Sequence, residues 1–267
     1  MTAVTGIDHA IVGVRDLEQA RAAWQRLGFA VTARGRHVGW GTANYCIMFP
    51  ADYVELLGIV DPAQDLHGLD AFLADREGVL ALALAAADAD AAYAQLRDAG
   101  VAAEPPQDLA RILDLPEGEV RPAFRVVHPA ATAALGQRLF VCQHLTPELM
   151  RRPGWLRHAN GARRLVAVTA AVADPAALEA AYHALFGGDA VSLGDDGLTV
   201  RMGSASCHFG PAEPGVEGML GIAVEVADLE AAADILARAG IRWSRSAGRV
   251  DVDPRDATGV ALSLVAG

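Results

Sequence analysis

The sequence lacks the features that mark membrane and secreted proteins. No uncharged apolar run reaches the ~18–20 residues that span a bilayer, and residues 1–12 do not combine a basic segment with an apolar one as a signal peptide does. Cysteine is scarce: Cys46, Cys142 and Cys207 are widely spaced in apolar contexts, which favours buried, reduced thiols over a disulfide framework or a zinc knot. We therefore expect a soluble, cytoplasmic protein with no membrane partner.

An excess of positive charge is also missing. The formal net charge of −11 repels a phosphate backbone, so no nucleic-acid partner is expected. The arginine-rich stretch at residues 151–164 is interpreted as solvated or interface surface. The sequence has no GxxxxGK loop, no GxGxxG after the first strand, no GxSxG elbow and no HExxH pair, and we expect no nucleotide cofactor.

The sequence does contain a repeat. An apolar strand, an aspartate, an alanine-rich helix and a glycine recur in this order four times. The helices are predicted to begin after Asp16, Asp88, Asp174 and Asp228 and to end near Gly28, Gly100, Gly187 and Gly240. Aspartate is a favoured N-cap because its carboxylate accepts from the free N–H groups of the first turn, and glycine suits the left-handed residue after the last turn.

Short β-rich runs separated by glycine, proline and aspartate follow each predicted helix. Each unit is therefore βαββ or βαβββ, which predicts the α+β class. One such unit leaves a sheet face uncovered, so we expect units to pack in pairs. Units one and two form a first domain, 1–150, residues 151–161 form a linker, and units three and four form a second domain, 162–267.

The stretches IDHAIVGVRDLEQARAAWQRLGF and YVELLGI in unit one, and VDPRDATGVALSLVA in unit four, resemble the vicinal-oxygen-chelate superfamily of glyoxalase I, extradiol dioxygenases, methylmalonyl-CoA epimerase and bleomycin-resistance proteins. GRHVGWGTANYCIMF followed by YVELLG is similar to its glyoxalase-like subgroup. The resemblance implies two domains with curved mixed sheets. It implies little about the reaction, since one fold hosts unrelated functions.

The resemblance also implies a metal site, with ligands on the first and last strands of paired units. His9 and Glu55 match in unit one, whereas Ala81 replaces the first-strand ligand of unit two and its last strand offers Gln143 or His144. A set of His9, Glu55 and His144 would suit one divalent ion, Zn, Fe, Mn, Ni or Mg. The equivalent positions of the second domain are Ala167, Gly221, Ser263 and His208, and we expect that half to be non-catalytic.

A second group of candidates lies in GRHVGWGTAN, where His37, Trp40, Thr42 and Asn44 accompany glycines at a predicted turn. These side chains are candidates for substrate binding, with His37 or Glu55 moving a proton. Arg125 would bind a carboxylate or phosphate if it points inward. The alternative interpretations are an ordinary hairpin with a packed tryptophan and, for His9, a hydrogen-bonded core histidine.

Two functions follow from these residues. The first is a metal-dependent lyase, isomerase or dioxygenase acting on a small oxygenated metabolite. The second is a metal-free protein that binds or sequesters a small molecule, and the missing ligand at Ala81 favours it. The expected partner is a small-molecule ligand, with a homodimer as one candidate assembly.

Overall fold

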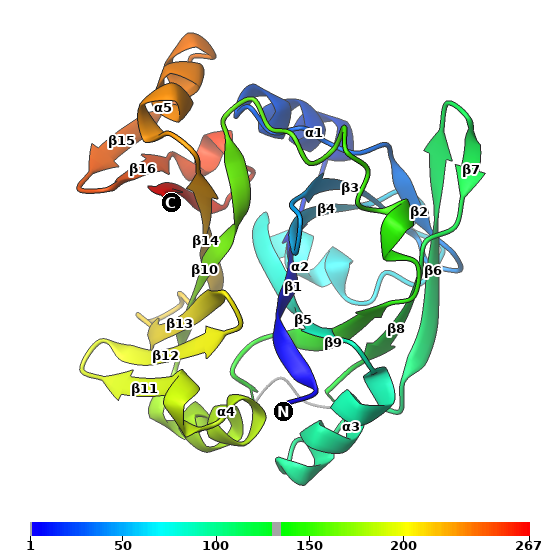
Figure 1. The fold of residues 1–267 in the computed structure, drawn as a ribbon, viewed down its shortest axis with the longest axis vertical. Coiled ribbons are helices and arrows are strands. Elements are labelled where there is room, and N and C mark those ends of the chain that lie inside the picture. The colour runs from blue at the N-terminus through cyan, green and yellow to red at the C-terminus, as the bar shows by residue number, and fades with distance from the viewer. Residues whose placement is uncertain (1, 130–134) are drawn as a thin grey trace.

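The computed structural model describes residues 2–129 and 135–267 and confirms the predicted fold class. The chain forms two curved mixed sheets, and each sheet is built from two consecutive units of the βαβββ type. Strands of the first sheet lie on the right of Figure 1 and those of the second on the left. The two sheets pack against each other.

The first sheet closes into a barrel. Its strands are β1 (Val4–Gly13), β2 (Gly35–His37), β3 (Thr42–Met48), β4 (Tyr53–Ile59), β5 (Gly78–Ala86), β6 (Gln107–Leu115), β7 (Gly118–Val120), β8 (Ala123–Val127) and β9 (Leu139–His144). They run in the order β2-β3-β4-β1-β5-β9-β8-β6-β7, and β2 also pairs with β6. This short pairing closes the ring and places His37 directly opposite Arg111. Closure gives the sheet an interior that side chains from the eight strands of the ring can reach, while β7 is appended to β6 outside it.

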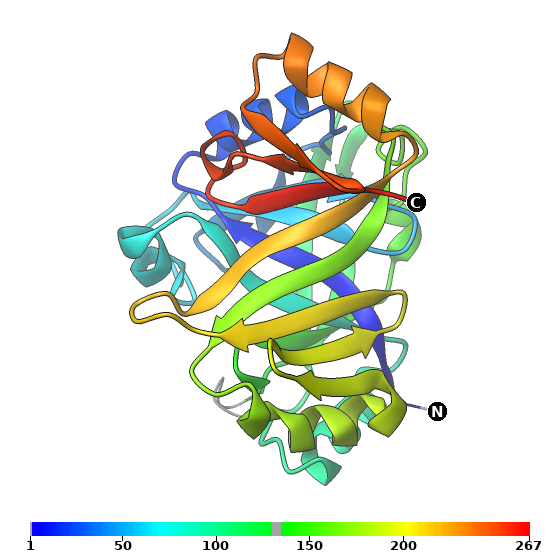
Figure 2. The same cartoon turned by 90° about the vertical axis from the view of Figure 1, so that its left-hand side faces the viewer.

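The second sheet stays open. Its strands are β10 (Ala162–Val172), β11 (Val191–Gly194), β12 (Gly197–Met202), β13 (Ala205–Pro211), β14 (Gly218–Val226), β15 (Trp243–Ser246), β16 (Arg249–Val252) and β17 (Ala261–Ala266). The order is β11-β12-β13-β10-β14-β17-β16-β15, without a pairing between its two edge strands. Figure 2 shows the face of this sheet that points away from the barrel.

The predicted aspartate caps are present in all four units. The α-helices are α1 (Leu17–Arg26), α2 (Leu69–Asp75), α3 (Ala89–Asp98), α4 (Glu179–Phe186) and α5 (Leu229–Arg238). Asp16, Asp88 and Asp228 each accept from two backbone N–H groups in the first turn of α1, α3 and α5. Asp174 does the same for a short 3-10 helix that leads into α4. The helix α2, between β4 and β5, was not expected from the sequence.

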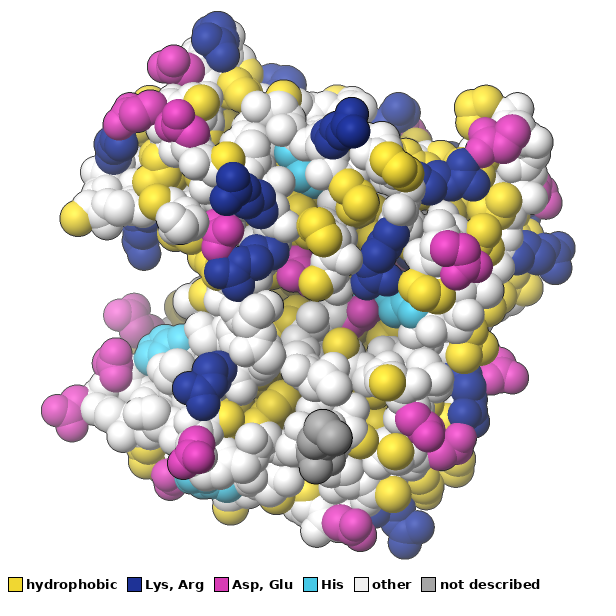
Figure 3. All heavy atoms as spheres, viewed as in Figure 1, with side chains coloured by type: hydrophobic (Ala, Val, Ile, Leu, Met, Phe, Trp, Pro, Cys, Tyr) yellow, Lys and Arg dark blue, Asp and Glu magenta, His cyan; other side chains and the backbone are white. Residues whose placement is uncertain are grey.

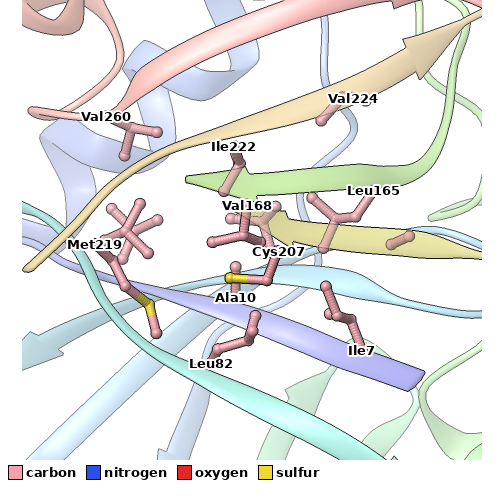
Figure 4. Close-up of a cluster of buried hydrophobic side chains, with 14 of the residues drawn as sticks. Ile7, Ala10, Leu82, Leu165, Val168, Cys207, Met219, Ile222, Val224 and Val260 are labelled. Atoms are coloured by element: carbon pink, nitrogen blue, oxygen red, sulfur yellow. The ribbon is translucent and has the colours of Figure 1, made fainter. Parts of the chain in front are cut away.

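The hydrophobic core is continuous between the two sheets. Ile7, Ala10 and Leu82 on the outer wall of the barrel pack toward Val168 and Ile222 of the second sheet (Figure 4). All are buried. A polar contact crosses the same interface, because Asp52 Oδ1, in the turn between β3 and β4, accepts from the Leu165 N–H at 2.9 Å. Both sheets therefore depend on one shared core for burial of their apolar faces.

The arginine-rich stretch after β9 contacts the rest of the chain. Arg151 donates to two carbonyl groups of the turn between β3 and β4, Arg152 pairs with Glu117, and Arg164 pairs with Glu225 at 2.6 Å. Figure 3 shows basic and acidic side chains interspersed over the face seen in Figure 1. None of the helices in the described part of the chain has the length and hydrophobicity needed to cross a membrane.

Candidate functional site

A bulge in β1 turns two successive side chains into the barrel. Ile7 pairs with Leu84 and His9 with Ala83, so Asp8 is an extra residue without a partner on β5. Strict alternation would place Asp8 and His9 on opposite faces, whereas a bulge removes that alternation locally. Both side chains are buried, and Asp8 Oδ2 lies 2.6 Å from His9 Nδ1.

The hydrogen bonds of Asp8 fix the orientation of the His9 ring. Burial disfavours the charged form of Asp8, but hydrogen bonds from His144 and His9 outweigh it and hold the pKa of Asp8 well below its usual value. The ionised carboxylate accepts at Nδ1 of His9, which leaves Nε2 as the ring nitrogen not bound by Asp8. Nε2 faces Glu55, with 3.4 Å between it and Oε2. The ring is also stacked on Tyr53, with centroids 4.2 Å apart.

Glu55 on β4 is a buried carboxylate with several polar neighbours. Asn44 Nδ2 donates to Oε1 at 2.5 Å, while Arg111 Nη1 and His37 Nε2 lie 3.8 Å and 3.7 Å from the same oxygen. Burial opposes ionisation, but the Arg111 charge, helped by the two histidines and Asn44, lowers the pKa of Glu55. Glu55 is therefore ionised at neutral pH, and its Oε2 approaches His9 Nε2.

The predicted site residues in GRHVGWGTAN lie around His9 and Glu55. His37 Nδ1 lies 2.8 Å from the Thr42 hydroxyl, and the Trp40 ring is 5.2 Å from the His37 ring. Burial lowers the pKa of His37 to about 4, so its ring is neutral at pH 7. His37, Trp40 and Thr42 face the interior, whereas Asn44 is fully buried behind Glu55 and holds its carboxylate.

The barrel encloses a cavity of about 290 Å³ beside these residues. Its wall combines aliphatic and aromatic side chains with a few polar ones. The polar or aromatic lining residues are His9, His37, Trp40, Thr42, Tyr53, Glu55, His67, Gln107, Arg111, Phe124, His128, Arg138, Phe140 and Cys142. Mostly apolar cavities with a few convergent polar groups are typical of small-molecule sites, and this volume suits a small ligand.

The strand register identifies the equivalent positions in unit two. Ile11 pairs with Glu55 on the parallel strand β4, and Ala83 pairs with Phe140 on the parallel strand β9. Phe140 therefore occupies the position of Glu55, and Ala81 occupies that of His9. Both line the cavity without offering a metal ligand. Of these four positions, only the two in unit one, His9 and Glu55, carry polar side chains.

Two sequence candidates do not face the cavity. Arg125 lies between Phe124 and Val126, which line the cavity, so its side chain points out of the barrel. It pairs with Asp90 at 2.6 Å, which corrects the inward orientation considered from the sequence. His144 is not among the cavity-lining residues either. Its Nε2 lies 3.0 Å from Asp8 Oδ2.

The alternative to His144 also points elsewhere. Gln143 bonds to the backbone of Ala87 and Ala89 at the start of α3. Among the predicted metal ligands, the structure brings His9 and Glu55 together and places His144 on the Asp8 side of the His9 ring.

Five cavity or near-cavity residues were missed by the sequence reasoning. They are Asp8, His67, Arg111, His128 and Arg138. Arg111 is only 2% exposed, and its sequence signal was an arginine within the apolar run ARIL on β6. Asp8 gave the corresponding signal as a charged residue next to His9 in an apolar strand. His67 and His128 lie in loops, where spacing predicts no orientation.

The second sheet lacks a comparable cluster at its equivalent positions. Ala167 occupies the place of His9, and His208, paired with Thr169, occupies that of Glu55. His208 is partly exposed and lies 3.0 Å from the Thr199 hydroxyl. Gly221 and Ser263 take the remaining two positions.

Two arrangements near His9 have the donors for a metal ion. His9 Nε2 and Glu55 Oε2 are 3.4 Å apart, a separation that suits two ligands each about 2.1 Å from one ion. Asp8, His9 and Cys142 also offer ligand atoms within 4.8 Å of one another. Burial raises the pKa of Cys142 well above its usual value, so the thiol keeps its proton. The His9 and Glu55 pair fits an ion better because both residues line the cavity and neither ligand atom is a protonated thiol.

Units of the βαβββ type, paired in a barrel with His9 and Glu55 on the first and last strands of one unit, define a vicinal-oxygen-chelate fold. The family model for the glyoxalase-like domain matches residues 7–186, more than half of the chain. The protein belongs to this glyoxalase-like family. A search of curated proteins finds no significant match.

Solved structures share the fold at low sequence identity. A hypothetical protein from Staphylococcus aureus superposes with a TM-score of 0.73 and 13% identity, over 98% of this chain and 99% of the other. A mutant of 4-hydroxymandelate synthase from Streptomyces coelicolor gives 0.61 and 13%, over 100% and 93%. A fusion of a xylose isomerase-like TIM barrel with 4-hydroxyphenylpyruvate dioxygenase gives 0.57 and 15%, over 99% of this chain and 49% of the other. These likenesses concern the fold alone.

Proposed function

We propose that the protein is a glyoxalase-like enzyme that acts on a small oxygenated metabolite in the barrel cavity. In this proposal one divalent metal ion is held by His9 Nε2 and Glu55. The observation that carries it is the approach of an imidazole nitrogen and a carboxylate oxygen, 3.4 Å apart, on the cavity wall. Both are ligand atoms that divalent first-row metals bind in proteins.

The surrounding residues support this role by fixing both atoms. Asp8 holds the His9 ring through Nδ1, the arrangement in which metal-binding histidines usually donate to a carboxylate. Asn44 fixes the Glu55 carboxylate by donating a hydrogen bond to Oε1. With only two protein ligands, further positions stay open for oxygen atoms of the substrate.

The metal would polarise a carbonyl or enediolate oxygen of the substrate. His37, neutral at pH 7 and 3.7 Å from Glu55, would exchange a proton with the substrate, with its ring oriented by the Thr42 hydroxyl. Trp40 and the aliphatic wall would exclude water from the bound molecule. This chemistry is that of a lyase, an isomerase or a dioxygenase.

Elemental analysis of purified protein tests the proposal. We expect about one metal ion per chain in the wild type and its loss in both His9→Ala and Glu55→Gln. The matched control is His208→Ala, which changes the position equivalent to Glu55 in the second sheet and should keep the metal. A wild type that carries no metal and takes none up at micromolar concentration would overturn this form of the proposal.

A second function has its own supporting observation. Ala81 and Phe140 leave half of the family's ligand positions apolar, and Arg111 already gives Glu55 a cation at 3.8 Å. This favours a metal-free protein that binds or sequesters a small molecule. Ligand binding that is unchanged by a chelator, without turnover, would distinguish it from the enzyme.

A further inference from the structure

Arg138 is a cation at the cavity wall without an acidic partner. It lies just before β9, and its Nη2 donates to the His67 carbonyl at 2.6 Å. Among the described residues no carboxylate lies within 4.0 Å of its guanidinium group, and residues 130–134 are alanines and one threonine. Because arginine stays protonated in proteins, a full positive charge remains at this wall.

The rest of the wall does not balance this charge. Glu55 is the only carboxylate among the described residues that line the cavity, and Arg111 already lies 3.8 Å from it. Arg111 is buried, and its Nε has no hydrogen-bond partner in the described structure. The lining residues therefore carry two arginines against one carboxylate, and the ionised Asp8 lies beside His9 without lining the cavity.

Two histidines lie near Arg138 and add donors. The His67 ring is 3.9 Å from the Trp40 ring, and the His128 ring is stacked on Phe140 at 5.4 Å. The nearest acid to His67 is Asp65, at 3.7 Å and exposed to solvent, and Asp65 does not line the cavity. These groups form one polar cluster, His67, His128 and Arg138.

The cluster and His9 both contact one aromatic ring. The centroid of the Phe140 ring lies 5.4 Å from that of His128 and 5.6 Å from that of His9. A ligand about as long as one ring with a short substituent would therefore span the distance. The cavity of about 290 Å³ has room for a molecule of this size.

We propose that the cavity selects a small organic anion whose carboxylate or phosphate group is bound by Arg138, beside His67 and His128, while the opposite end of the molecule reaches His9 and Glu55. Guanidinium groups bind both kinds of oxyanion through parallel N–H donors. The inference deepens the proposed function by naming the class of substrate, and it concerns the same cavity.

Isothermal titration calorimetry with three matched probes tests it. Phenylacetate and phenylacetamide have nearly the same shape and differ in charge, and phenyl phosphate distinguishes a phosphate from a carboxylate. The titrations use full-length protein treated with a chelator, so that the presence of a metal does not affect the result. The variants are Arg138→Met, Arg138→Lys and, as the matched control, Arg125→Met, an arginine on the outer face of the same barrel.

We expect at least one of the two anions to bind the wild type about tenfold more tightly than phenylacetamide. The preference should fall below about threefold in Arg138→Met, be partly kept in Arg138→Lys and be unchanged in Arg125→Met. Unchanged affinity of Arg138→Met for phenylacetamide would show that its cavity is intact.

Three results would overturn the inference: no binding of either anion below about 10 mM, no preference over the amide, or an undiminished preference in Arg138→Met. Failure of the metal proposal leaves these titrations unaffected.

Discussion

The orientation of the His9 ring depends on Asp8, the residue before it. Asp8 accepts at His9 Nδ1 and also from His144, so it holds the ring with Nε2 toward Glu55. A carboxamide can present its NH2 group instead of an acceptor, which would release the ring.

We expect Asp8→Asn to weaken metal affinity about 10–100-fold while leaving both proposed ligands in place. Competition with a metallochromic chelator measures the change. Asp108→Asn is the control, because the side chain of Asp108 is 87% exposed. Equal metal affinity of Asp8→Asn and the wild type would contradict this role for Asp8.

Arg111 compensates the charge of Glu55 inside the barrel. Arg111→Met should raise the pKa of Glu55 and lower the free energy of unfolding by about 3–5 kcal/mol, because a buried carboxylate loses its cation. Urea denaturation at pH 7 measures the loss. The double variant Arg111→Met with Glu55→Gln should recover part of it.

The partly exposed Arg125 provides the comparison, since its ion pair with Asp90 is solvated and Arg125→Met should unfold close to the wild type. Equal losses for the two arginine variants would show that Arg111 does not compensate a buried charge.

The resemblance to the vicinal-oxygen-chelate superfamily implied His9 and Glu55 as ligands, because it places ligands on the first and last strands of a unit. Sequence reasoning missed Asp8, because alternation assigns adjacent residues to opposite faces and only the observed register reveals the bulge. The orientation of Arg111 and Arg125 was not predictable, since an arginine in an apolar strand can point to either face until its partners are known. For the same reason, spacing suggested Gln143 or His144 where the register places Phe140.

Helices were predicted better than strand pairings. Each aspartate cap is a local signal read within four residues, and all four are present. The closure of the first sheet rests on contacts between β2 and β6, which are distant in sequence. Local capping chemistry leaves a pattern in the sequence, whereas a pairing between distant strands does not.

The turn between β3 and β4 joins the two sheets through Asp52. Burial raises the pKa of Asp52 from its ordinary value of 3.8 to about 7. Between these values the folded protein binds more protons at this group than the unfolded chain does. Asp52 therefore contributes stability at low pH that is lost as the pH rises from about 4 through 7.

Asp52→Asn should keep the acceptor for the Leu165 N–H and remove this dependence. We expect its free energy of unfolding to exceed that of the wild type by about 1–3 kcal/mol at pH 8, with little difference at pH 4. Urea titrations across this range measure both. If the difference between variant and wild type does not change with pH, Asp52 is not the titrating group.

At the scale of the whole molecule, the shared core predicts that the two sheets unfold together. Calorimetry should show one transition whose calorimetric and van't Hoff enthalpies agree. Leu165→Ala, in the second sheet, should lower its midpoint without splitting it, because Leu165 is fully buried in the common core, and should cost about 2–5 kcal/mol.

The exposed Leu193→Ala is its control, and we expect its midpoint to match that of the wild type. Two separate transitions in the wild type would mean that each sheet is stable by itself.

The pairing of β2 with β6 is a short part of the barrel wall, since β2 spans only Gly35–His37. Short pairings of this kind open locally at a lower free-energy cost than the long β1–β5 ladder of the same barrel. Backbone amides at 35–37 and 111–113 should therefore exchange with deuterium faster than those of β1. Because His37 and Arg111 form one rung of this pairing and both face the cavity, a bound ligand should slow exchange there first. Hydrogen exchange at this seam would then report occupancy of the cavity even when no reaction is known to assay.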